Sequence, residues 1–198
     1  MRDSQRTRLV TAILEVVGRQ GYEATTVADV VASARVSRNA FYGQFRDRQD
    51  CFIAACDALG RDMLDALYEH AEAATWIAAV EAGLDAYLEA WASIPGVAFS
   101  YFVEFPTAGR RALDQRDRAY ADFAAMFEAL AARARTEQPE LAPLRPFVPR
   151  ILVTAITELI AQEARAGRGG SVADLRPELL HLIVLLLADE ATADRVAR

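Results

Sequence analysis

The chain has 198 residues, of which 53% are hydrophobic and 25% charged. This composition is typical of a globular protein with a sizeable core. Glycine (10) and proline (7) are sparse, which favours helices over sheet. The longest apolar run, residues 182–188, is far shorter than the roughly 20 residues that span a bilayer. With no visible signal peptide, we expect a cytoplasmic protein that has no membrane contact.

Charge is distributed unevenly along the chain, whose net charge is −6. All 22 basic residues are arginines. Residues 1–50 carry 8 arginines against 6 acids, whereas the remainder carries 14 against 22. Any contact with nucleic acid is therefore expected near the amino terminus.

The first 47 residues predict three short helices. Apolar residues at helical spacing begin near residue 9, and Gly21 ends that first helix. Thr26, with Asp29 three residues later, resembles a capping box for a second helix that ends near Ala34. Ser37 is a suitable N-cap for a third helix that runs to about residue 45. Two short helices joined by about three residues form a helix-turn-helix.

The rest of the chain also reads as helix. Asp47 caps a long fourth helix, and apolar residues recur at helical spacing over about 76–91, 97–105, 113–130, 148–166 and 175–195. Prolines punctuate a connector over residues 139–149. Strand-like alternation is absent, so we predict an all-α fold of about nine helices.

One segment resembles the DNA-binding signature of the TetR family of transcriptional regulators. The resemblance is carried by residues 21–30, 34–37, 41–45 and 48, and covers about the first 50 residues. It implies a helix-turn-helix DNA-binding domain over residues 1–47 and a ligand-binding and dimerisation domain over residues 48–198. Arg35 departs from the family's usual glycine, so the turn either avoids a positive φ or holds Arg35 under mild strain. Arg48 replaces the usual lysine and keeps its charge.

The third helix supplies candidate contacts to operator DNA. An α-helix fits the major groove, and its N-terminal residues reach base edges. Arginine suits guanine and asparagine suits adenine, although either can hold a phosphate instead. The resemblance implies that the Tyr42 hydroxyl contacts a phosphate, and Thr26 and Arg48 are candidates for two more. The predicted DNA-binding residues are Thr26, Arg35, Ser37, Arg38, Asn39, Tyr42 and Arg48. Alternatively, Tyr42 is an ordinary core-edge aromatic and the arginines form a solvated face.

The resemblance also implies an inducer pocket in the aromatic-rich middle of the chain. The expected lining residues are Tyr87, Trp91, Phe99, Phe102, Glu104, Tyr120, Phe123 and Phe127. Alternatively, these aromatic residues simply fill a core. Glu104 is the one acid in an apolar segment, so it is solvated, paired with Arg110 or Arg111, or placed to recognise a cationic or hydrogen-bonding ligand.

The last two predicted helices are expected to form a homodimer interface, which the resemblance describes as a four-helix bundle. Its predicted residues are Ile151, Ile156, Leu159, Leu179, Leu182 and Leu186. Periodicity alone also allows both helices to be buried within one protomer.

The sequence gives little support to an enzyme. It holds two histidines, His70 and His181, with no metal-ligand cluster, phosphate loop or nucleophile elbow. Cys51 and Cys56 are five residues apart on one predicted helix, which makes a disulfide between them unfavourable. We therefore expect no metal and no cofactor. The predicted function is a repressor that a small hydrophobic inducer releases from double-stranded operator DNA, through movement of the fourth helix. An activator, or a binding module that has lost DNA binding, remains an alternative.

Overall fold

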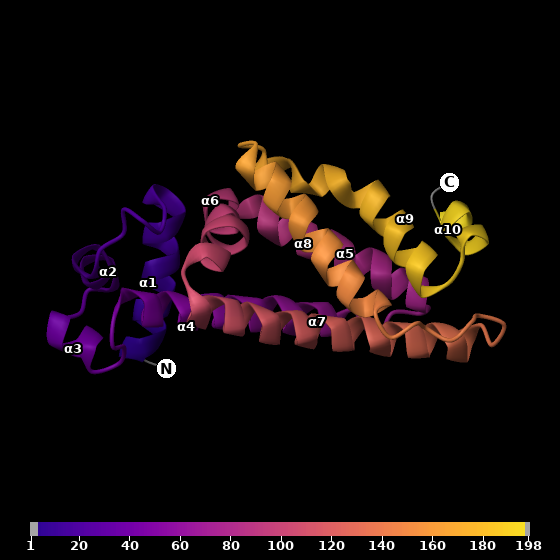
Figure 1. The fold of residues 1–198 in the computed structure, drawn as a ribbon, viewed down its shortest axis with the longest axis horizontal. Helices are drawn as coiled ribbons and strands as arrows, with labels where there is room; N and C mark the ends of the chain where they lie inside the picture. Colours follow the sequence, from indigo (N-terminus) through magenta and orange to yellow (C-terminus); the bar gives the residue numbers. More distant parts are fainter. Residues whose placement is uncertain (1–3, 197–198) are drawn as a thin grey trace.

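A computed structural model describes residues 4–196, and in this part of the chain every regular secondary-structure element is a helix. Three short helices form a head at one end of an elongated molecule: α1 (Gln5–Gln20), α2 (Val27–Ala34) and α3 (Arg38–Tyr42) (Figure 1). The long helix α4 (Arg48–Glu69) leads from the head into the body. The all-α prediction is confirmed.

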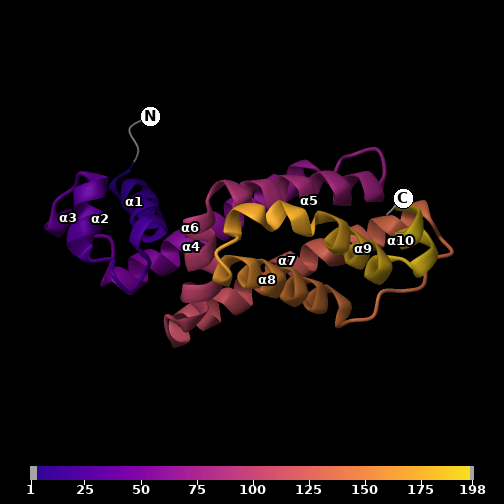
Figure 2. The same cartoon turned by 90° about the horizontal axis from the view of Figure 1, so that it is seen from above.

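The body is built on α4 and the longest helix, α7 (Arg110–Glu137), which lie side by side. Its α-helices are completed by α5 (Trp76–Ser93), α6 (Pro95–Phe99), α8 (Val148–Arg165), α9 (Arg176–Leu187) and α10 (Glu190–Val196). Shorter turns are η1 (Ser100–Glu104), η2 (Phe105–Thr107) and η3 (Gly169–Leu175). Helix α8 packs on α7, and α9 contacts both α8 and α5 (Figure 2).

Two predicted helices are interrupted in the structure. One of them splits into two α-helices, so the described residues hold ten α-helices where about nine were expected. The last one breaks at Ala188 (φ −126°, ψ −103°) into α9 and α10, and Asp189 accepts a hydrogen bond from the Thr192 N–H at 2.7 Å. The segment 97–105 is the end of α6 followed by a π-helical turn, η1, and the start of a 3₁₀ turn, η2. Pro106 contributes to this irregularity because it has no N–H to donate.

The predicted helix boundaries of the head are largely confirmed. Gly21 ends α1 at φ 80°. Thr26 and Asp29 form a reciprocal capping box, with N···O distances of 3.2 and 2.9 Å. Ser37 caps α3 by accepting from the Ala40 N–H at 3.1 Å. Helix α3 ends at Tyr42, three residues earlier than predicted.

The molecule has two apolar cores. The head core is centred on Leu9, Ile13, Val30 and Phe41, and it also takes in Phe105 from the body. The first turns of α4, residues 51–56, belong to this core as well, so the packing of the head continues past residue 47. The body core fills the space between α5, α7, α8 and α9.

Head and body meet backbone to backbone at two glycines. A Cβ added to Gly96 of α6 would lie 1.9 Å from the carbonyl oxygen of Gly18 in α1. A Cβ on Gly18 would lie 2.9 Å from a methyl of Val97. Glycine is therefore required at Gly96 for α6 to approach α1 this closely.

We predict that Gly96→Ala destabilises the protein by about 1–3 kcal/mol, the usual penalty for overpacking. The reason is that α6 must move away from α1 to admit the methyl group. Thermal unfolding measures the effect, and Gly170→Ala is the matched control because a Cβ there meets no atom within 4 Å. An unchanged melting temperature for Gly96→Ala would show that the two helices do not meet as described.

Candidate DNA-binding surface and ligand cavity

The turn between α2 and α3 contains a strained residue. Arg35 has φ 52° and ψ 48°, the left-handed conformation, and among the described residues it is the one non-glycine residue with positive φ. Of the two predicted outcomes, the structure shows the strained one. The backbone N–H of Arg35 donates to the carbonyls of Val31 and Ala32, and this ends α2. A residue held in this region stores strain of order 1 kcal/mol or more.

The third helix presents its N-terminal residues to solvent. Six of the seven predicted DNA-binding residues are exposed: Thr26, Arg35, Ser37, Arg38, Asn39 and Tyr42. Tyr42 is 55% exposed although its neighbour Phe41 is fully buried, so Tyr42 is not a core-edge residue. Neither Arg35 nor Arg38 is found in an ion pair within residues 4–196. The surface therefore offers positive charge that no protein carboxylate neutralises.

Arg48 does not belong to this exposed set. Its guanidinium turns inward and donates to the carbonyls of Tyr22 at 3.0 Å, of Glu23 at 3.2 Å and of Thr25. It also lies 4.2 Å from the centre of the Tyr22 ring, a cation–π distance. The Nη1 group of Arg48 thus holds the turn before α2, while its phosphate contact stays a prediction.

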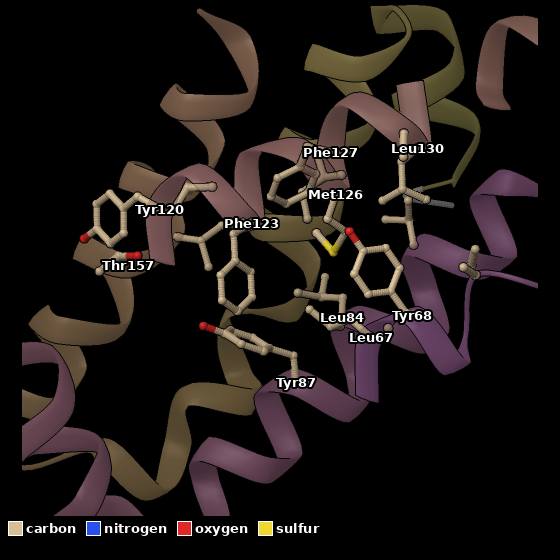
Figure 3. A pocket seen from close by; sticks show the side chains of 18 of the residues that line it. Leu67, Tyr68, Leu84, Tyr87, Tyr120, Phe123, Met126, Phe127, Leu130 and Thr157 are labelled. Atoms are coloured by element: carbon tan, nitrogen blue, oxygen red, sulfur yellow. The ribbon is translucent and has the colours of Figure 1, made fainter. Parts of the chain in front are cut away.

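The body contains a cavity of about 260 Å³ (Figure 3). Five predicted residues line it: Tyr87, Phe102, Tyr120, Phe123 and Phe127. Sequence reasoning missed Leu67, Tyr68, Leu84, Tyr101, Met126, Leu130, Arg133, Val153, Thr157 and Ile183, among others. These residues come from α4, α5, η1, α7, α8 and α9, and helical periodicity does not show which apolar residues leave a space unfilled.

Three predicted lining residues lie elsewhere. Trp91 is buried behind the wall, with its ring 4.9 Å from Tyr101 and 4.6 Å from Phe102. Phe99 lies outside the cavity on α6. Glu104 points to the head, where its two carboxylate oxygens accept the Tyr22 N–H at 3.1 and 3.0 Å. Its expected partners are engaged elsewhere: Arg110 pairs with Asp114 and Arg111 with Asp50.

The cavity has an apolar wall with a few hydroxyl groups. In the view of Figure 3, Tyr120 and Thr157 lie on one side and Tyr68 and Leu130 on the other. Burial raises the pKa of the Tyr87 and Tyr101 phenols, so both are neutral at physiological pH.

Arg133 is the one charged residue that lines the cavity within residues 4–196, and its charge is already compensated. It donates to Glu137 at 2.6 Å and to the carbonyls of Ala71 and Ala73. Glu137 in turn accepts a hydrogen bond from the backbone N–H of Trp76, at 3.0 and 3.1 Å from its two oxygens. This bond, with the Arg133 charge, lowers the pKa of Glu137. The pair thus pins the loop between α4 and α5.

The predicted dimer residues fall into two groups. Ile156 and Leu179 are buried inside the protomer, and Ile156 lines the cavity, so the sequence-based assignment of these two to a dimer surface is wrong for this protomer. Ile151 is 53% exposed on α8, and Leu159, Leu182 and Leu186 are half-buried. Phe147, which precedes α8, is 77% exposed. We call Phe147, Ile151, Leu159, Leu182 and Leu186 the apolar α8–α9 face.

Other chemistry finds little support in the described residues. They hold no group of three or more His, Cys, Asp or Glu side chains placed for a metal ion. Burial raises the pKa of the Cys51 thiol to about 12 and that of Cys56 well above its ordinary value, so both are poor nucleophiles. None of the helices in residues 4–196 has the length and apolar character needed to cross a membrane.

Comparisons with known proteins agree with this architecture. Residues 9–55 match the family model of bacterial regulatory proteins, tetR family. A search of curated proteins gives no match. Among solved structures, the fatty acid degradation regulator FadR from Bacillus halodurans is similar with a TM-score of 0.81 at 12% identity, covering 93% of this chain and 96% of that one.

Two further structures show the same fold. The transcriptional regulator FadR from Bacillus subtilis, in complex with stearoyl-CoA, has a TM-score of 0.77 at 14% identity and covers 89% of this chain and 96% of that one. A bacterial regulatory protein in the tetR family from Rhodococcus RHA1 has a TM-score of 0.66 at 17% identity, covering 91% and 97%. Residues 9–55 are therefore similar to the tetR family of bacterial regulatory proteins, and head and body together share the fold of these solved regulators.

Proposed function

We propose that the protein is a homodimeric transcriptional repressor that leaves its operator when a small, uncharged hydrophobic ligand occupies the body cavity. The observation that carries this proposal is the exposed N-terminus of α3, where the side chains of Arg38 and Asn39 are exposed to solvent beside a second exposed arginine, Arg35. A regulator of chromosomal DNA acts in the cytoplasm of a bacterium, which is where we place it.

DNA recognition uses two kinds of contact. Arg38 and Asn39 occupy the first turn of α3 and are proposed to reach base edges in the major groove. Thr26, Arg35, Ser37 and Tyr42 surround them and are proposed to hold phosphates. The acidic remainder of the chain limits binding to this surface, since its net charge repels the phosphate backbone.

Dimerisation is needed because one short helix contacts too few base pairs for a specific operator. Two recognition helices about 34 Å apart read successive turns of the major groove. The apolar α8–α9 face is the proposed interface, because soluble proteins seldom leave side chains such as Phe147 and Ile151 in water.

The ligand is proposed to be apolar and neutral. The similar structure from Bacillus subtilis holds stearoyl-CoA, and the apolar wall seen here suits an acyl chain or another lipophilic group. A charged group placed in this cavity would lose its hydration and find Arg133 already paired, which makes its burial unfavourable.

Arg38→Ala combined with Tyr42→Phe is predicted to weaken specific DNA binding strongly while leaving the fold and the dimer intact. Loss of one base contact and one phosphate contact is expected to cost about 2–4 kcal/mol, or roughly 30- to 1,000-fold in affinity. Fluorescence anisotropy on a duplex selected from random DNA measures this, and Arg145→Ala, an exposed arginine in the connector between α7 and α8, is the control. Equal affinity of the double variant and the wild type for the duplex would exclude α3 as the helix that recognises DNA.

Ile151→Glu combined with Leu182→Glu is predicted to convert the dimer to monomer. Two buried carboxylates per protomer without partners would oppose association strongly. Sedimentation velocity over a range of protein concentrations measures the state, and circular dichroism checks that helix content is kept. A variant that stays dimeric would place the interface elsewhere.

The cavity is predicted to prefer neutral over anionic ligands of equal length. The fluorophore 1-aminoanthracene should bind, and 1-decanol should displace it at least about 10-fold more effectively than decanoate. Leu84→Trp fills the cavity and should abolish the signal, whereas Leu144→Trp, outside the cavity, should not. Stronger displacement by decanoate would contradict the neutral character assigned to the ligand.

A further inference from the structure

Tyr22, just after α1, is where the body holds the head. Its N–H is the donor to both oxygens of Glu104, which belongs to η1 in the body. The Ser100 hydroxyl, at the start of the same turn, donates to Glu104 and so orients its carboxylate. Gly21 lies beside this contact with φ 80°, and a Cβ there would be 3.1 Å from a Glu104 oxygen.

A series of contacts between aromatic rings connects the cavity to Tyr22. Tyr101 lines the cavity and stacks on Phe105, with ring centres 6.1 Å apart at 21°. Phe105 meets Phe52 edge to face at 5.7 Å, and Phe52 stacks on the Tyr22 ring at 4.5 Å. Rings packed in this way move together, because protein interiors leave little free space between them.

On the head side, Tyr22 is tied directly to the start of α2. Arg48 binds the carbonyls of Tyr22 and Thr25, and the next residue, Thr26, is the N-cap of α2. A displacement of Tyr22 therefore changes the position of α2, on which α3 packs.

The polar contacts between the body and the start of α4 lack this connection to the cavity. Arg111 pairs with Asp50, and Gln49 donates to the Ala108 carbonyl. Neither Ala108 nor Arg111 lines the cavity. The turn η1 is different because it places Tyr101 and Phe102 in the cavity wall and Glu104 against the head within five residues.

We infer that Glu104 is a positioning residue that couples ligand occupancy to the orientation of the DNA-binding head. The inference rests on the proposed control of DNA binding by a ligand in the cavity, and adds the route. A ligand that displaces Tyr101 and Phe102 carries Glu104 with them, because the three residues share one turn. The Tyr22 N–H then loses its acceptor, and the head leaves the orientation that fits the operator.

Amide hydrogen exchange at Tyr22 tests the contact itself in the full-length dimer. In Glu104→Ala the Tyr22 amide should exchange at least about 10-fold faster than in wild type, because its acceptor is gone. Glu104→Gln, which keeps one carbonyl oxygen as acceptor, should restore part of the protection. Glu89→Ala, which removes an exposed acid from α5, is the matched control and should change nothing. Equal Tyr22 exchange in Glu104→Ala and wild type would overturn the inference.

The same variants test the coupling. Saturating 1-aminoanthracene should accelerate Tyr22 exchange in wild type and have no further effect in Glu104→Ala. Affinity for the selected duplex should fall at least about 5-fold in Glu104→Ala without ligand, the low end of allosteric couplings. Bound fluorophore that leaves Tyr22 exchange unchanged in wild type, or an unaltered affinity of the variant for DNA, would contradict the coupling.

Failure of the proposed function gives a different pattern. If the fluorophore does not bind, the ligand assignment fails, whereas the effects of Glu104→Ala on Tyr22 exchange and DNA affinity still decide on the positioning role. If no duplex can be selected, DNA binding fails, and Tyr22 exchange with and without fluorophore still decides on the coupling.

Discussion

The geometry of the head depends on how Tyr22 is held. Two parts of the chain meet this residue. Glu104 of η1 accepts a hydrogen bond from its N–H, and at the start of α4 Arg48 donates to its carbonyl and Phe52 stacks on its ring. The Glu104 carboxylate gives the half-buried Tyr22 N–H its acceptor, a group that would otherwise lack a protein partner. The turn that follows leads into α2, so the position of α3, the proposed recognition helix, depends on Tyr22. The glycine contact between α1 and α6 holds the same junction from the other side and leaves no space for a side chain.

This arrangement relates two surfaces that need opposite chemistry. Arg38 at the start of α3 and Arg35 in the turn before it are exposed and form no ion pair within residues 4–196, which suits the phosphates and base edges of DNA. The cavity in the body is apolar, and Arg133 in its wall is already paired with Glu137 and two carbonyls. The η1 turn lies between the two and contributes to both. The strained backbone of Arg35 lies in the turn that precedes α3. Strained residues are often found at functional sites.

The sequence predicted helix boundaries well where a residue type has a single local role, such as capping or ending a helix. Gly21, Thr26, Ser37 and Asp47 bound helices as their chemistry predicts, and the all-helical fold follows from apolar periodicity. Long-range partners could not be predicted in this way. Arg48 and Glu104 are charged residues in the expected segments, but each binds backbone groups distant in sequence, at Tyr22, and no local pattern marks such a contact. For the same reason Ile156 and Leu179 could not be separated from Ile151, because burial within a protomer and burial in an interface share one periodicity. The division of the chain at residue 47 stays a prediction, and the shared head core explains why the boundary is not sharp.

We propose that ligand and operator favour different conformations of one dimer. Reciprocal linkage tests it most directly: the dissociation constant of 1-aminoanthracene is measured with and without a saturating selected duplex. If the two sites are coupled as described, the fluorophore binds about 5- to 150-fold more weakly to the DNA-bound dimer, the range expected for coupling free energies of 1–3 kcal/mol. Equal affinity for the free and the DNA-bound dimer would contradict the account, since a ligand that binds both conformations equally shifts neither.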